Sequence, residues 1–148
     1  MPAIIPTHYL DRMCETRDYQ DLVWISGVLC GSRYFQSHAP TYGFPDAAFS
    51  IVERVAWFAQ GIRSGAWTYY EAALPECQTA MLAVLERDTS HPDFAEKYAF
   101  GMREWRVPTA MRALDHWLDA SDDRNTSIAW QIVAANRGLI QRLASTDR

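Results

Sequence analysis

Apolar residues recur at helical spacing along most of this chain, and this pattern constrains the fold more than any other feature. The clearest helix lies between residues 74 and 85, where one apolar stripe consists of Leu74, Cys77, Met81, Val84 and Leu85. The chain has no sustained alternation of apolar and polar residues, and it lacks the Asn-Gly and Asp-Gly pairs typical of tight hairpins. The sequence therefore predicts an all-α protein of about seven to eight short helices.

Prolines and short polar side chains indicate where these helices begin. A first helix is expected from Pro6 and Thr7 to about Glu15, and Asp18 is expected to cap a second helix with Leu22, Ile25 and Leu29 on one face. The later helices are expected to begin at Asp46, Ala66, Pro75, the segment Ser90 to Asp93, Pro108, and Asn125 or Thr126.

The helix that begins at Asp46 is expected to turn one apolar face inward. Gly65 follows its last turn, where a residue in the left-handed αL conformation commonly ends a helix. The helix that begins at Pro108 should likewise bury Val107, Met111, Leu114 and Leu118. In the helix from Asp46 the residues expected in the core are Phe49, Val52, Val55, Ala59 and Ile62.

The length of 148 residues suits a single domain that covers residues 1–148. A chain of this size buries roughly 70 % of the surface that its unfolded form exposes, so the core needs neither a metal nor a disulfide. Cys14, Cys30 and Cys77 lie far apart in helical patterns, and we expect buried free thiols in a reducing compartment. No signal-peptide pattern and no apolar run near ~20 residues is present, which favours the cytoplasm and excludes a membrane partner.

Charge and motif content exclude several classes of function. The net charge of -4 and the absence of clustered Lys and Arg argue against direct nucleic-acid binding. The four histidines are far apart and form no HExxH motif, so no metal site is expected. No nucleophile elbow, phosphate loop or dinucleotide fingerprint occurs, so we expect no catalytic residue and no cofactor.

Aromatic side chains near helix breaks are the first candidates for a binding surface. The segment 64–71 sets the helix-breaking Gly65 beside several rings, and the connection around residues 37–45 contains further rings next to prolines. Among the six tryptophans, Trp24, Trp57 and Trp130 are expected in the core, whereas Trp67, Trp105 and Trp117 adjoin a break or a polar face. The candidate partner-binding residues of this kind are Tyr42, Phe44, Trp67 and Tyr70, with Glu71 beside them.

Four carboxylates form the second candidate surface. Asp115, Asp119, Asp122 and Asp123 are expected at the end of one helix and in the turn that follows it. One interpretation is a solvated loop that caps the next helix. The other is a negative patch that attracts a basic partner.

The segment from about residue 51 to residue 90 also resembles a known family. Its order of helix, Ser64-Gly65-Ala66-Trp67-Thr68-Tyr69-Tyr70-Glu71, short helix and Ala/Leu-rich helix is similar to the core of a bacterial all-α family of unknown-function domains that includes a DNA-mimic protein. The resemblance implies a small helical bacterial protein of the cytosol without a known catalytic apparatus. A DNA mimic would be far more acidic than -4, so the resemblance does not imply that activity here.

These features favour a non-catalytic protein-binding module, most of all an immunity or antitoxin type of protein that occludes the active site of a basic toxin domain. One alternative is an acidic inhibitor or co-regulator of a DNA-binding protein. Another is an enzyme whose pocket lacks any linear motif. The sequence leaves open the identity of the partner, the toxin activity that is neutralised, the oligomeric state, and which aromatic residues belong to an interface.

Overall fold

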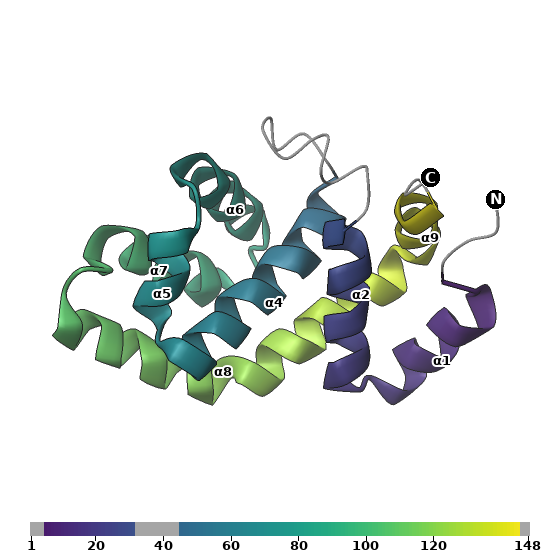
Figure 1. Cartoon of the computed structure of the whole chain (residues 1–148), viewed down its shortest axis with the longest axis horizontal. Helices are drawn as coiled ribbons and strands as arrows, with labels where there is room; N and C mark the ends of the chain where they lie inside the picture. Colours follow the sequence, from purple (N-terminus) through teal and green to yellow (C-terminus); the bar gives the residue numbers. More distant parts are fainter. Residues whose placement is uncertain (1–4, 32–44, 146–148) are drawn as a thin grey trace. The chain divides into compact units, whose positions relative to one another are not determined.

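A computed structural model describes residues 5–31 and 45–145 of the chain, and these residues form eight helices and no strand (Figure 1). The predicted all-α class is confirmed. Tyr42 and Phe44, two of the candidate partner-binding residues, lie outside the described residues.

The chain divides into two units by its internal contacts. The first unit consists of Met1–Val55 and Arg124–Arg148, and the second consists of Ala56–Asp123. The divisions fall inside helices α4 (Asp46–Ser64) and α8 (Pro108–Ala135), so each of these helices contributes residues to both units. The prediction of one domain over residues 1–148 stays a prediction.

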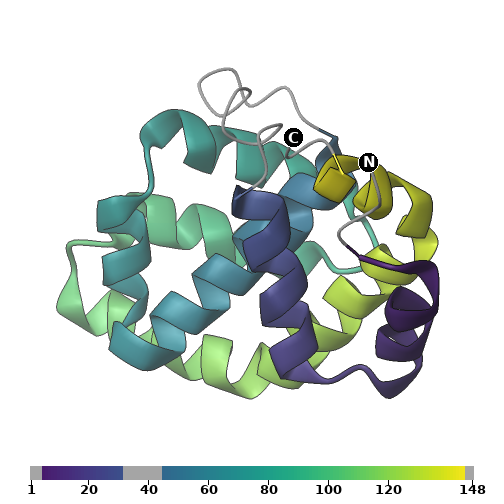
Figure 2. The ribbon, with the colours of Figure 1, turned by 45° about the vertical axis from the view of Figure 1, so that its right-hand side comes forward.

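In the first unit, helices α1 (Thr7–Thr16) and α2 (Tyr19–Gly31) lie close to α9 (Arg137–Ser145), as Figure 2 shows. An ion pair joins Arg137 Nη1 to Asp11 Oδ1 at 2.8 Å, and Gln141 Nε2 donates to the carbonyl oxygen of Ile5 at 3.1 Å. The backbone N–H of Gln20 donates to Asp18 Oδ1 at 2.7 Å, which confirms Asp18 as the cap of α2. The predicted inward face of α2 is also confirmed, since Leu22, Ile25 and Leu29 are buried.

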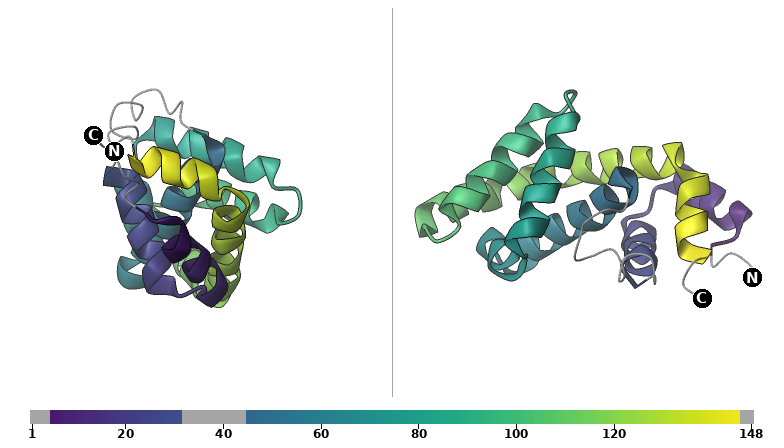
Figure 3. Two further views of the ribbon diagram at one scale, coloured as in Figure 1. Left: turned by 90° about the vertical axis from the view of Figure 1, so that its right-hand side faces the viewer. Right: turned by 90° about the horizontal axis from the view of Figure 1, so that it is seen from above.

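In the second unit, α7 (Pro92–Glu104) packs against both α5 (Ala66–Ala72) and α6 (Pro75–Arg87), and Figure 3 shows α6 and α7 beside each other. Pro75 and Pro92 lie in the first turns of their helices, as predicted, because proline lacks the N–H that a first turn would leave unbonded. The core of this unit is aromatic. Ring centroids 5.0 to 6.0 Å apart connect Trp57, Phe58, Phe94, Tyr98 and Trp117.

Helix α8 corrects one predicted boundary. We expected a turn near Asp122 and a new helix from Asn125 or Thr126, but α8 runs without a break from Pro108 to Ala135 and the turn comes at Asn136. The helix continues past this point because the Asn125 side chain is buried in a hydrogen bond with Arg54. Its Oδ1 accepts a hydrogen bond from Arg54 Nη1 at 3.2 Å, and both side chains are 2 % exposed. Asn125 therefore pairs with a buried cation in the middle of a helix instead of capping one.

Several expected core residues prove to be exposed. Trp24 is 47 % exposed because it lies about 200° around the helix from the buried Leu22. Ile62 near the end of α4, Leu74 before α6 and Val107 before α8 are exposed as well. Trp57 and Trp130 are fully buried, as predicted.

Gly65 differs in detail from its prediction. It has a positive φ of 100°, but its ψ of 141° lies outside the αL region, and it immediately precedes α5. The assignment as an αL residue is therefore wrong. The need for glycine at this position remains, because side chains rarely tolerate a positive φ with extended ψ.

Candidate functional site

Helix α5 separates the candidate aromatic residues into two groups. Trp67 and Glu71 are four residues apart and share the exposed side of the helix, with Trp67 44 % exposed. Tyr70 is 2 % exposed, so the expectation that its ring is available to a partner is wrong. The sequence could not distinguish Trp67 from Tyr70, because both are large aromatic residues in one short helix.

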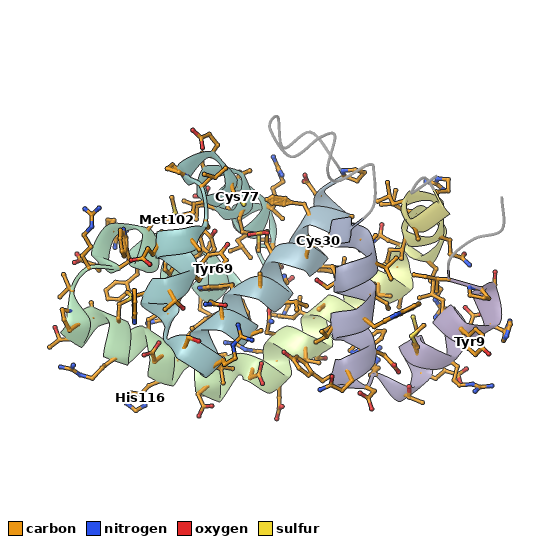
Figure 4. All side chains as sticks on the ribbon, in the orientation of Figure 1. Tyr9, Cys30, Tyr69, Cys77, Met102 and His116 are labelled. Carbon is orange, nitrogen blue, oxygen red and sulfur yellow. The ribbon has the colours of Figure 1, made fainter. Side chains whose placement is uncertain are left out.

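Tyr70 belongs to a buried hydroxyl cluster. Its hydroxyl donates to the carbonyl oxygen of Tyr98 at 3.1 Å, and the hydroxyl groups of Tyr69 and Tyr98 are hydrogen-bonded at 2.7 Å. Tyr69 is labelled in Figure 4. Burial raises the pKa of Tyr70 above its usual value of 10, because an ionised ring would lose its hydration. These contacts explain why α5 turns Tyr70 toward α7.

Trp67 lines an open groove with a volume of about 440 Å³, which we call the Trp67 groove. Trp105 and Arg106 reach it from the turn after α7, whereas Met111, Arg112 and Asp115 reach it from α8. The groove thus combines two indole rings with charged side chains of both signs. Of its lining residues, the sequence indicated Trp67 and Asp115 but not the two arginines, since a single arginine in a turn or on a helix surface carries no motif.

Asp115 holds the start of α5 beside this groove. Its Oδ1 accepts a hydrogen bond from the backbone N–H of Ala66 at 2.7 Å. Ala66 is the first residue of α5, so its N–H has no acceptor within the helix, and Gly65 occupies the N-cap position before it. A β-carbon on Gly65 would lie 3.1 Å from the ring of Trp67 and 3.9 Å from Asp115 Oδ2. Gly65 therefore leaves room for Trp67 next to the carboxylate.

The two arginines give the groove its positive side. The guanidinium of Arg106 stacks over the Trp105 ring at 4.5 Å from the ring centroid, which restricts both side chains. Arg112 is exposed on α8. In the part of the chain that the structure describes, no ion pair involves Arg106 or Arg112. Their guanidinium groups are thus available to carboxylates of another molecule.

The four carboxylates form a stripe along α8, which we call the acidic stripe. The spacing of Asp115, Asp119 and Asp123 is i, i+4 and i+8, so the three side chains share one face of a continuous helix, and Asp122 adjoins them. The interpretation as a loop that caps the next helix is wrong, because α8 does not end there. Asp119 and Asp123 are exposed, and within residues 5–31 and 45–145 neither forms an ion pair.

The pKa of Asp122 reflects the negative charges of its neighbours. Partial burial raises the pKa of this carboxyl above 3.8, and the nearby Asp123 and Asp119 raise it further. The stripe is therefore a region where an added positive charge is favourable.

Other predicted features are placed as follows. His116 is exposed on α8 and is labelled in Figure 4. The three cysteines are free thiols, of which Cys14 is buried and Cys77 is half-buried, whereas Cys30 is exposed, contrary to expectation.

The described residues contain no cluster of three or more His, Cys, Asp or Glu side chains suited to a metal ion. None of the described helices combines the length and apolar character that crossing a membrane requires.

Comparison of the chain with protein-family models, with curated proteins and with solved structures found no significant match. The resemblance of residues 51–90 to a bacterial all-α family stays a prediction. The Trp67 groove and the acidic stripe are therefore the features from which a function can be inferred.

Proposed function

We propose that this protein is a non-catalytic protein-binding module of the immunity or antitoxin type, which acts in the bacterial cytoplasm and occludes the active site of a basic toxin domain. One observation carries the proposal. An exposed Trp67 ring lies beside Asp115, and Asp115 is also the first residue of the acidic stripe. An aromatic anchor and a charged surface are thus continuous on one unit of the protein.

This combination matches the way in which protein interfaces obtain affinity. Tryptophan and arginine are enriched among residues that dominate binding energy, because they bury large rings or planar groups at the centre of an interface. The Trp67 groove supplies both residue types. Carboxylates at the rim contribute less affinity, but they accelerate encounter with a positive partner.

The charge distribution favours a basic partner over a neutral one. Asp119 and Asp123 are exposed and lack an ion-pair partner among the described residues. Asp122 already has a raised pKa next to them. Lys or Arg side chains of a partner would relieve this repulsion, and many toxins that act on nucleic acids or phosphate-containing substrates need a basic active site.

Affinity capture from the native host tests the proposal with matched variants. Trp67→Ala should weaken retention of the partner by about 2 kcal/mol or more, which is roughly 30-fold in Kd. The control is Ile62→Ala, which removes an apolar side chain of the same unit with nearly the same exposure, 45 % against 44 %. Ile62→Ala should leave capture unchanged.

The acidic stripe is tested by the double variant Asp119→Asn with Asp123→Asn. This variant should slow association and reduce the dependence of binding on salt, whereas Glu86→Gln with Glu96→Gln, two acids on other helices, should do neither. Co-expression with the captured partner should restore growth for the wild type and fail for Trp67→Ala. Equal capture and equal protection by the Trp67→Ala variant would contradict the proposal.

A further inference from the structure

A second groove lies between α1 and α2, within the first unit of the protein. Its volume is about 630 Å³, and its lining includes Tyr9 and Met13 from α1 and Trp24 from α2. Tyr9 is 51 % exposed and Trp24 is 47 % exposed. Two large aromatic rings therefore border an apolar depression that no part of the described chain fills. Tyr9 is labelled in Figure 4.

Helix α2 is apolar on both of its sides. Leu22, Ile25 and Leu29 bury one side in the core, whereas Val23 and Trp24 are exposed on another. A helix that is apolar all round is normally covered all round, because exposed apolar area costs about 25 cal/mol per Å². The outer side of α2 thus has the character of an interface.

Gly27 adds a steric argument at the middle of this outer side. It is exposed, and a β-carbon placed there would meet no atom within 4 Å. A glycine in a helix interior costs roughly 0.5–1 kcal/mol relative to alanine, so packing inside the described chain does not explain it. The missing side chain allows the backbone of another element to approach α2 closely next to Trp24.

The charges in the α1–α2 groove favour one kind of binding partner over others. Arg12 from α1 and Asp21 from α2 both line it, so the groove carries one cation and one anion. Within the described ranges neither residue forms an ion pair. A strongly basic or strongly acidic partner would satisfy one of these charges and repel the other. A two-fold contact between identical copies satisfies both, because Arg12 of each copy can face Asp21 of the other.

We infer that the α1–α2 groove is the interface of a homodimer, in which Trp24 of each copy enters the groove of the other copy and Arg12 pairs with Asp21 across the two-fold axis. The inference does not depend on the proposed function, because neither Trp67 nor the acidic stripe takes part. It assigns a role to Trp24, whose ring the sequence had placed in the core.

Sedimentation equilibrium of the full chain over a range of concentrations tests the inference. The wild type should show a monomer–dimer equilibrium, and Trp24→Ala should raise the dimer Kd by roughly 30-fold or more, as expected for a central tryptophan. Ile62→Ala, whose exposure of 45 % is close to the 47 % of Trp24, should leave the Kd unchanged. Circular dichroism should show that both variants remain folded, because both side chains are exposed.

A charge swap tests the geometry without truncating any ring. Arg12→Glu and Asp21→Arg should each weaken self-association, because each places like charges opposite one another twice. An equimolar mixture of the two variants should form heterodimers. In the mixed dimer the new glutamate of one copy faces the new arginine of the other, and the unchanged Asp21 faces the unchanged Arg12. The double variant should recover the homodimer.

Two outcomes would overturn the inference. The wild type could remain monomeric at every concentration reached, or its dimer could persist unchanged in both Trp24→Ala and the single charge variants. In either case the Trp67→Ala capture experiment would still decide the proposed function, because it uses residues of the other unit.

Discussion

Asp115 on α8 accepts a hydrogen bond from the backbone N–H of Ala66 at the start of α5, with 2.7 Å between Oδ1 and the nitrogen and a sequence separation of 49. The N-cap residue of α5 is Gly65, which has no side chain. A carboxylate from another helix therefore binds a first-turn N–H that has no acceptor within α5 and that a local N-cap side chain would not normally reach. The same carboxylate lines the Trp67 groove, so one residue links local helix stability to the candidate site.

Loss of this capping bond should be measurable. Asp115→Ala should lower the free energy of unfolding by about 1–2 kcal/mol, the usual order for loss of one part-buried hydrogen bond to a charged acceptor. Asp115→Asn should lower it less, because the amide oxygen can still accept the bond. Urea denaturation gives these values, and Asp119→Ala serves as the control with an expected change of about 0.5 kcal/mol or less. Equal stabilities of Asp115→Ala and Asp119→Ala would show that the bond contributes nothing.

Gly65 should tolerate no side chain without a cost. Its φ of 100° and ψ of 141° lie in a region that residues other than glycine rarely adopt, and a β-carbon would lie 3.1 Å from the Trp67 ring. Gly65→Ala should destabilise the protein by about 1–3 kcal/mol, and Gly65→Val by at least as much. Gly138→Ala, in α9 where a β-carbon meets only an ordinary 3.6 Å contact, should be neutral or slightly stabilising in the same melting experiment. A neutral Gly65→Ala would refute this backbone assignment.

Truncation of Tyr70 should lower the free energy of unfolding much more than truncation of Trp67. Tyr70→Ala should cost about 3–5 kcal/mol, comparable to other buried aromatic truncations and to the about 2–5 kcal/mol expected for Leu85→Ala. Tyr70→Phe should cost about 0.5–1.5 kcal/mol through loss of the bond to the Tyr98 carbonyl oxygen. Trp67→Ala should cost about 1–1.5 kcal/mol, because the ring is 44 % exposed and only its buried part loses contacts. Similar unfolding midpoints for Tyr70→Ala and Trp67→Ala would be incompatible with this structure.

Asp122 should make stability depend on pH in a defined direction. Partial burial, then Asp123 and Asp119, raise the pKa of Asp122 in the folded protein above 3.8. The folded state therefore holds this proton more tightly than the unfolded state, and stability falls as the pH rises from 3.8 through the folded pKa. Asp122→Asn cannot ionise, so its melting temperature should exceed that of the wild type at pH 7.

The difference between Asp122→Asn and the wild type should shrink as the pH falls and vanish below 3.8. Asp123→Lys provides a second test, because it replaces the neighbouring negative charge by a positive one and should also raise the melting temperature at pH 7. A lower melting temperature of Asp122→Asn at neutral pH would mean that the charged carboxylate stabilises the fold.

Alkylation of the native protein should rank the cysteines by exposure. Cys30 is exposed and should react with iodoacetamide first, whereas Cys14 should react last. Burial raises the pKa of the Cys14 thiol, which lowers the fraction of reactive thiolate. Mass spectrometry of peptides over time gives the order, and denaturant should remove the difference. Prompt labelling of native Cys14 would contradict its burial.

Several helix starts are the part of this structure that the sequence determined by itself. Pro75 and Pro92 lie in first turns, and Asp18 caps α2, because each of these effects involves backbone groups within one turn of the residue itself. Strictly local chemistry needs no knowledge of the rest of the chain. The all-α class follows in the same way from apolar spacing within each segment.

Tertiary structure alone decided which side chains are available for function. Tyr70 is buried, contrary to expectation, because burial depends on neighbours that are distant in sequence, such as Tyr98, whose carbonyl oxygen binds the Tyr70 hydroxyl. Asn125 continues α8 instead of starting a helix, because Arg54 binds its side chain from 71 residues away. The Trp67 groove likewise joins α5, the turn after α7 and α8. Long-range contacts of this kind depend on the packing of the whole chain, and no local pattern of residues encodes them.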